Sequence, residues 1–232
     1  MPVSISVFGN AVSLYYLFWF IAVAVALLIS AMIAKDYGYS PYKGITLSSV
    51  ALIMGLLLIW MTSLIFDGFN LIRTIAFLPL LYYLEALVFK EPYKRLTDFL
   101  TPMGVTCFGI THFGCMFPGC CHGFPSSWGI YSNTAETVCF PVQPLEAVVS
   151  IAIGMLMLLM AKKKWQQGKL LFWMMTLFGS TRFFLEFLRD NPKLWGNVSE
   201  LALHALATFV VGVVGLILVT YFDKRRCNNE KN

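Results

Sequence analysis

The sequence has 232 residues, of which 58% are hydrophobic and only 12% are charged. Soluble domains average roughly 45–50% apolar and about 25% charged residues, so this composition argues against a soluble globular protein. The formal net charge is +5. No basic face with room for a duplex is visible in the sequence, so nucleic acid is not an expected partner.

Seven apolar stretches take up almost the whole chain, each long enough to be considered a membrane span. A run of about 18 or more apolar residues can cross a hydrocarbon core of about 30 Å. In chain order the stretches are roughly 11–34, 44–66, 70–89, 96–118, 143–161, 169–188 and 199–222. They predict an all-α integral membrane protein with about seven transmembrane helices. We expect 1–222 to form a single polytopic membrane domain and 223–232 to be a polar, disordered cytoplasmic tail.

The basic residues fall mostly in alternate connections between these stretches. Residues 1–10 contain no Lys or Arg, so the first stretch is not expected to be a cleavable signal peptide. Lys35 and Lys43 follow that stretch, and further basic groups lie within 90–95, 162–169 and 224–231. The positive-inside rule therefore predicts an outside N-terminus and an inside C-terminus.

Four charged or titratable side chains are predicted to lie at one depth. Polar groups inside a membrane are costly and are candidates for function. At 1.5 Å per residue, His112 lies about 24 Å above the inner end of its stretch, and Arg182 and Glu186 lie about 20 and 25 Å above theirs. Glu146 opens the next stretch from the outside. We expect the four to converge near the outer leaflet, although the Arg182–Glu186 pair could also serve only to fix helix register.

The most unusual segment is HFGCMFPGCCHG, which occupies residues 112–123. A zinc site there could draw on His112, Cys115, Cys120, Cys121 and His122. The spacing H-x2-C-x4-C-C-H lacks the paired C-x2-4-C of structural zinc sites, so no metal or other cofactor is expected. A redox dithiol is also disfavoured, because no C-x-x-C is present.

A structural disulfide is the simplest use of these cysteines. Cys139 could pair with Cys120 or Cys121, because the outer side of a membrane is often oxidising. The glycines indicate a second feature of the segment. Gly114, Gly119 and Gly123 imply a close backbone approach or a positive φ, and such a turn can present N–H groups to an anion. A glycine-rich turn between basic residues suits a phospholipid head group.

Three motifs, taken together, resemble the bacterial prolipoprotein diacylglyceryl transferases. The first motif covers the stretch at 96–118 and the turn after it, and its matching positions are Asp98, Pro102, Gly114, Gly119 and Gly123. The second is FPVQPLE, with Pro141, Gln143 and Glu146. The third matches at Gly179, Arg182, Phe183, Glu186, Phe187 and Arg189. The resemblance covers roughly residues 90–222 and implies seven helices with the N-terminus outside, in a bacterial plasma membrane.

The chain departs from this family's pattern at several positions. His112 stands where the signature has Arg, Cys115 where it has Asn, and Cys120 where it has Glu. The histidine–glycine motif expected in the third stretch is absent, since residues 70–76 read NLIRTIA. Family variants with a GC…GCC-x-G stretch also resemble this sequence.

The resemblance implies a transfer reaction and assigns roles to residues. A diacylglyceryl group would pass from phosphatidylglycerol, a membrane lipid, to the lipobox cysteine thiol of a prolipoprotein or peptide. The catalytic candidates are Arg182, Glu186, His112 and His122. Arg182, held by Glu186, would stabilise the leaving phosphate, and His112 would act either as a cation or as the general base, a role that His122 could also take. The substrate-binding candidates are Gly114, Cys115, Gly119, Gly123, Gln143, Glu146 and Arg189.

Two other interpretations stay open at this point. The chain could be a diverged relative that acts on another lipid or peptide acceptor. It could instead be a membrane protein that carries out thiol redox chemistry or binds a metal ion.

Overall fold

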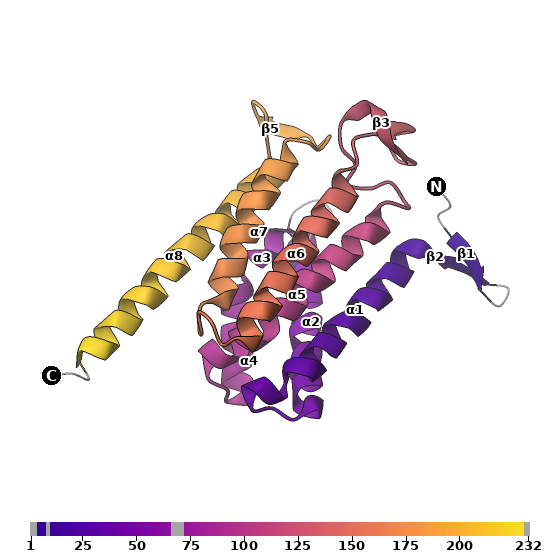
Figure 1. Cartoon of the computed structure of the whole chain (residues 1–232). Helices are drawn as coiled ribbons and strands as arrows, with labels where there is room; N and C mark the ends of the chain where they lie inside the picture. Colours follow the sequence, from indigo (N-terminus) through magenta and orange to yellow (C-terminus); the bar gives the residue numbers. More distant parts are fainter. Residues whose placement is uncertain (1–3, 8–9, 66–71, 230–232) are drawn as a thin grey trace.

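In its described residues the protein is a bundle of helices with three short antiparallel hairpins (Figure 1). The computed structural model describes residues 4–7, 10–65 and 72–229. The helices are α1 (Leu14–Ile33), the 3-10 helix η1 (Lys35–Tyr37), α2 (Pro41–Ser63), α3 (Ile72–Ile75), α4 (Leu78–Phe89), α5 (Tyr93–Cys115), α6 (Val142–Lys162), α7 (Leu170–Glu186) and α8 (Glu200–Asn229). The hairpins pair β1 (Ser4–Val7) with β2 (Asn10–Ser13), β3 (Pro125–Ser132) with β4 (Thr137–Cys139), and β5 (Lys193–Trp195) with β6 (Val198–Ser199).

Four of these helices are long and apolar enough to cross a membrane. They are α1, α2, α6 and α8. Many large apolar side chains on the helices are exposed, among them Phe20, Leu28, Ile53, Leu159 and Ile217. A water-soluble monomer rarely exposes so much apolar surface, whereas a bilayer covers it. The composition-based prediction of a helical membrane protein is therefore confirmed in this coarse form.

The structure corrects the sequence prediction in two places. The third stretch, 70–89, does not form one helix among its described residues, because α3 and α4 are separate and α4 has only 12 residues. Proline in the first turn of α4 fixes the start of that helix, since its missing N–H is tolerated there. The expected disordered tail is also wrong as far as it is described, because α8 continues through Asn229.

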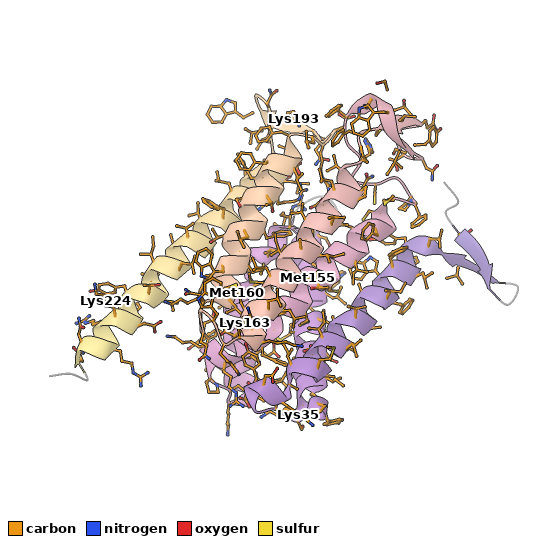
Figure 2. All side chains as sticks on the ribbon, in the orientation of Figure 1. Lys35, Met155, Met160, Lys163, Lys193 and Lys224 are labelled. Carbon is orange, nitrogen blue, oxygen red and sulfur yellow. The ribbon has the colours of Figure 1, made fainter. Side chains whose placement is uncertain are left out.

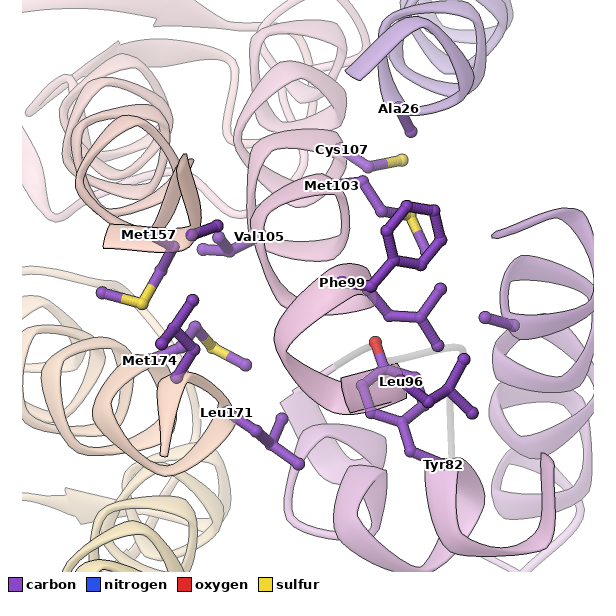
Figure 3. Packing of buried hydrophobic residues seen from close by; sticks show 14 of the residues in the cluster. Ala26, Tyr82, Leu96, Phe99, Met103, Val105, Cys107, Met157, Leu171 and Met174 are labelled. Carbon is purple, nitrogen blue, oxygen red and sulfur yellow. The ribbon is translucent and has the colours of Figure 1, made fainter. Parts of the chain in front are cut away.

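Helix α5 is the centre of the bundle. It contacts α1, α2, α4, α6 and α7, and most of its side chains are buried. Figure 3 shows Val105 pointing toward Met157 of α6, while Met103 and Cys107 point the other way, toward Ala26 of α1. Met103 and Cys107, four positions apart, thus lie on one side of α5, whereas Val105, two positions from each, lies on the other, and α5 packs against helices on both sides.

Small residues let α5 and α6 approach closely. A Cβ on Gly109 would lie 2.9 Å from the carbonyl oxygen of Ala147, and one on Gly154 would lie 2.1 Å from the Thr106 hydroxyl oxygen. Small residues at such crossings allow backbones to pack without side chains between them. Glu146 directly precedes Ala147, and close packing at Ala147 therefore brings Glu146 near His112 of α5, whose Nε2 lies 3.3 Å from its Oε2.

Basic residues gather at one end of the bundle. Figure 2 shows Lys35, Lys163 and Lys224 toward the end opposite Lys193, which lies beside the β5 hairpin. Hairpins β3 and β5 share the end that carries Lys193 (Figure 1). The two ends of the bundle therefore differ in both charge and architecture.

A buried carboxylate joins the starts of α5 and α7. Asp98, 2% exposed, accepts hydrogen bonds from the backbone N–H groups of Gly168, at 2.5 Å, and Leu170, at 3.1 Å. These N–H groups lie at the beginning of α7, where no preceding turn can satisfy them. Asp98 thus caps α7 from another helix.

We predict that Asp98→Ala lowers the free energy of unfolding by about 1–3 kcal/mol, because it leaves two buried donors without an acceptor. Thermal unfolding of the detergent-solubilised protein measures the effect. Asp223→Ala is the matched control: Asp223 is part-exposed and pairs with Lys94 and Lys169, so its loss should change stability by less than about 1 kcal/mol. Equal melting temperatures for the two variants would contradict the capping role.

Candidate functional site

A single buried carboxylate collects three basic side chains from three segments. Glu146, in the first turns of α6, is 1% exposed. Its Oε1 lies 2.8 Å from Nε of Arg182, and its Oε2 lies 3.3 Å from Nε2 of His112 and accepts a hydrogen bond from Arg189. Arg182 comes from α7, His112 from the last turn of α5, and Arg189 from the segment after α7.

Glu186 forms the second carboxylate of this cluster. Its Oε2 lies 2.5 Å from Nη1 of Arg182, one turn earlier on the same helix. Its Oε1 accepts hydrogen bonds from the Ser199 hydroxyl, at 2.7 Å, and from the Asn191 side chain. Ser199 in turn accepts a hydrogen bond from the N–H of Ala202 at the start of α8. Glu186 therefore links the end of α7 to the beginning of α8.

The expected convergence of His112, Glu146, Arg182 and Glu186 is thus observed. Two carboxylates and two guanidinium groups balance in charge, and His112 adds a further positive charge when it is protonated. Ser199 and Asn191 were missed by the sequence reasoning. Asn191 follows the polar pair at 189–190, and Ser199 precedes an acidic residue at a helix start, so the polar connection between the last two stretches was the available signal.

Both ring nitrogens of His112 face oxygen acceptors. Nδ1 lies 3.3 Å from the carbonyl oxygen of Phe108, and Nε2 faces Glu146. A neutral imidazole can donate to only one of these oxygens, whereas an imidazolium donates to both. The ring of Phe108 packs against His112 with centroids 4.3 Å apart, which fixes the imidazole in place.

The segment after α5 forms a turn that the β3–β4 hairpin holds from outside. Gly119 has φ +80° and Cys121 has φ +58°. Carbonyl oxygens of the turn accept hydrogen bonds from side chains of the hairpin and of α6: Phe117 from Asn133, Pro118 from Thr134, Gly119 from Ser132, and Cys120 from Gln143. A turn tied at four successive carbonyls is well fixed, and its N–H and thiol groups take defined positions.

The three glycines singled out in the sequence have different surroundings. Gly114 packs on α1, where a Cβ would lie 3.0 Å from the Phe18 side chain. Gly119 adopts the positive φ that the sequence suggested. Gly123 pairs through its backbone with Arg189, and a Cβ there would lie 2.5 Å from the carbonyl oxygen of Phe140. Gly123 thus brings the turn against the segment that carries Arg189.

The cysteines are arranged differently from the disulfide expectation. The five cysteines whose side chains the structure describes, Cys107, Cys115, Cys120, Cys121 and Cys139, are all free thiols. The sulfur atoms of Cys115, Cys120 and Cys121 lie within 4.8 Å of one another. The predicted disulfide from Cys139 to Cys120 or Cys121 is therefore wrong.

Cys139 instead belongs to the hairpin. The β3–β4 register pairs it with Ile130 and Pro125 and directs its sulfur toward Nδ1 of His122, at 3.9 Å. His122 also lies 3.0 Å from the carbonyl oxygen of Gly123 through the same nitrogen. These contacts place His122 beside the hairpin, whereas His112 is the histidine that contacts Glu146.

Arg189 connects the ion-pair cluster to the three thiols. Its guanidinium group contacts Glu146 and is close enough to the Cys121 thiol to interact with it electrostatically. Hydrogen bonds with the Cys115 and Cys120 thiols, together with Arg189, hold the pKa of the Cys121 thiol well below its ordinary value. Charged and sulfur groups therefore form one continuous site.

An apolar cavity lies next to this site. It has a volume of about 130 Å³ and is lined by residues of α1, α2, α3, α4, α5 and α7. Its wall includes Trp19, Gly55, Tyr82, Phe108 and Thr111. Phe108 also packs on His112, so its ring lies between the cavity and the ion-pair cluster.

The protein is thus a helical membrane protein with a buried carboxylate–guanidinium cluster near an apolar cavity. The family model described as "Prolipoprotein diacylglyceryl transferase" matches residues 2–221. This chain belongs to that family.

Two curated relatives agree with this assignment over part of the chain. It is 28% identical over 131 residues to phosphatidylglycerol–prolipoprotein diacylglyceryl transferase 2 of Clostridium perfringens (strain 13 / Type A), which covers 53% of this chain and 50% of the relative. It is 25% identical over 129 residues to phosphatidylglycerol–prolipoprotein diacylglyceryl transferase of Clostridium tetani (strain Massachusetts / E88), which covers 51% of each. The chain thus spans about half the length of the curated relatives it matches.

We predict that Glu146→Ala lowers the free energy of unfolding by about 3–5 kcal/mol, because it leaves Arg182 and Arg189 buried without their shared carboxylate. Thermal unfolding in detergent, followed by tryptophan fluorescence, measures the change. Glu136→Ala, on the exposed turn of the β3–β4 hairpin, is the control and should leave the melting temperature almost unchanged. A Glu146→Ala protein as stable as this control would show that the cluster does not depend on Glu146.

Proposed function

We propose that this protein transfers the diacylglyceryl group of phosphatidylglycerol to the lipobox cysteine thiol of a prolipoprotein, at the outer face of a bacterial plasma membrane. The observation that carries the proposal is the Glu146-centred cluster at the end of an apolar cavity. Membership of the family and the printed activities of the two relatives support the same reaction.

The proposal includes seven spans with the N-terminus outside. All seven apolar stretches contain helix in their described residues. The gathering of Lys35, Lys163 and Lys224 at one end of the bundle supports that end as the cytoplasmic one, by the positive-inside rule (Figure 2). The ion-pair cluster then belongs to the outer half, where phosphatidylglycerol of the outer leaflet is within reach.

In this proposal the cavity takes an acyl part of the lipid and the cluster takes its phosphate. The lipobox thiolate attacks the glycerol carbon beside the phosphate, a carbon–sulfur bond forms, and the carbon–oxygen bond breaks. Glycerol phosphate leaves with the bonding electron pair. Arg182, aligned by Glu146 and Glu186, stabilises the negative charge of that leaving group, because a fixed cation needs no reorganisation during the reaction.

His112 supplies the second positive group at the phosphate. Both of its ring nitrogens face oxygen acceptors, so the ring donates to both when it is protonated, and it stands where the family signature has an arginine. Glu146 and the Phe108 carbonyl orient it, and Gln143 fixes the neighbouring turn through the carbonyl of Cys120. His122, beside Cys139, is the candidate for accepting the proton of the acceptor thiol.

We predict that Arg182→Ala lowers the rate of transfer of labelled phosphatidylglycerol to a lipobox peptide by at least about 100-fold, the usual cost of losing one such donor. The assay uses membranes that carry the full chain. Lys193→Ala, a change of an exposed basic residue at the same end of the bundle, is the control and should transfer normally. Normal transfer by Arg182→Ala would remove Arg182 from the mechanism.

We also predict that His112→Arg retains or exceeds the transfer rate of the natural sequence, because an arginine keeps a permanent positive charge at this position. His112→Gln, which is uncharged, should transfer much more slowly in the same assay. An inactive His112→Arg protein alongside an active His112→Gln protein would exclude the cationic role. Loss of activity in both would assign His112 to proton transfer instead.

The departures at positions 112, 115 and 120 favour testing one alternative, a relative that acts on another acceptor. Complementation of a strain without its own transferase separates the two functions. Restored lipoprotein maturation supports the proposed reaction. Failure of complementation, with transfer to a different acceptor in a panel of phospholipids and thiol or hydroxyl compounds, would replace it.

A further inference from the structure

Three thiols of the turn after α5 meet at one point. Cys115 is the last residue of α5, and Cys120 and Cys121 lie on the turn. Their sulfur atoms are within 4.8 Å of one another, and Cys115 is 8% exposed. The adjacent cysteines therefore both turn toward the helix end, which their spacing in the sequence did not suggest.

The backbone holds this arrangement at some cost. Cys121 has φ +58°, a conformation that residues with side chains rarely adopt. Such strain persists only where the surroundings enforce it. The four hydrogen bonds from the hairpin and from Gln143 provide that enforcement. The thiols are thus positioned before any ligand arrives.

The spacing of the sulfurs fits a single thiophilic cation. A zinc ion with bonds of about 2.3 Å to sulfur holds tetrahedral ligands about 3.8 Å apart, so movements of about 1 Å or less would close the described trio around an ion. Soft sulfur donors select Zn²⁺ or Cu⁺ over hard cations. Three thiolates and Zn²⁺ carry one net negative charge, and the Arg189 guanidinium beside Cys121 is placed to neutralise it.

We propose that Cys115, Cys120 and Cys121 bind one Zn²⁺ through three thiolates and leave a fourth position open, where the acceptor thiol coordinates. The metal-binding part stands on the thiol geometry alone, whereas the acceptor part rests on the proposed function. Catalytic zinc sites characteristically have three protein ligands and one exchangeable position.

The open position gives the acceptor thiol a way to react at neutral pH. When the thiol binds zinc, its proton passes to water or to a nearby base, and the sulfur becomes a zinc-bound thiolate. That sulfur then attacks the glycerol carbon of the lipid, and glycerol phosphate leaves toward Arg182 with the electron pair of the broken bond. The thioether formed is uncharged and a weaker ligand, so the product dissociates and the zinc keeps its oxidation state throughout.

The first test measures the metal content of the full chain, purified in detergent under reducing conditions from zinc-supplemented cells. We expect about one zinc per chain in the natural sequence and a loss of at least about tenfold in Cys115→Ser, Cys120→Ser and Cys121→Ser. Cys107→Ser, on the same helix, and Cys139→Ser, on the hairpin, are matched controls that should keep their zinc. Unchanged zinc in the three variants, zinc loss in the controls as well, or copper in place of zinc would overturn the proposal.

The second test uses the natural sequence, so its result does not depend on whether a variant folds. Metal-free natural protein titrated with Co²⁺ should develop intense near-ultraviolet sulfur-to-cobalt absorption that saturates at one Co²⁺ per chain. A lipobox peptide should then shift the visible bands, and the same peptide with serine in place of its cysteine should not. Absence of the sulfur absorption overturns the metal site, and equal shifts with both peptides overturn the open position.

The transfer assay separates this inference from the proposed function. Zinc binding at the three thiols without transfer to any lipobox peptide would reject the proposed function and leave the metal site standing. Full transfer by metal-free protein, with a chelator present, would reject the catalytic use of zinc and leave the proposed function standing.

Discussion

The structure depends on how one buried carboxylate is neutralised. Glu146 lies inside the bundle, and an uncompensated charge there would cost several kcal/mol. Its partners come from α5, α7 and the segment beyond α7, so the charge is stabilised only when these segments are assembled around α6. The same requirement that brings the segments together also concentrates two guanidinium groups and an imidazole in one place.

Close helix packing makes this arrangement possible. Gly109 and Gly154 allow α5 and α6 to cross with almost no side chain between them. Asp98 ties the start of α7 to α5 at one end, and Glu186 ties its other end to α8 through Ser199. Helix α7 is therefore fixed at both ends, and Arg182 between them has little freedom to move away from Glu146.

The hairpin β3–β4 gives the turn after α5 its shape. Donors from the hairpin satisfy the carbonyls of the turn, and Gly123 lets it pack against the segment of Arg189. Arg189 then contacts Glu146 and interacts electrostatically with Cys121. Positive charge and sulfur donors thus lie next to each other, with the apolar cavity on the other side of Phe108.

The sequence by itself determined the helical membrane class, the approximate places of the helices, and the common level of His112, Glu146, Arg182 and Glu186. Apolar run length and a fixed rise per residue suffice for these features, because both are local properties of the chain. The break between α3 and α4 was missed because the apolar composition of 70–89 continues across it. The continuation of α8 to Asn229 was missed because a polar composition was taken to mean disorder.

Only the tertiary structure decided the partners of the cysteines and histidines. The register of the β3–β4 hairpin places the Cys139 sulfur beside His122. The three thiols of the turn after α5 meet where Cys121 adopts a positive φ. Ser199 and Asn191 join the site through Glu186, across a loop whose path the sequence does not specify. Such contacts depend on how separate segments cross in space, and no periodicity along the chain encodes that.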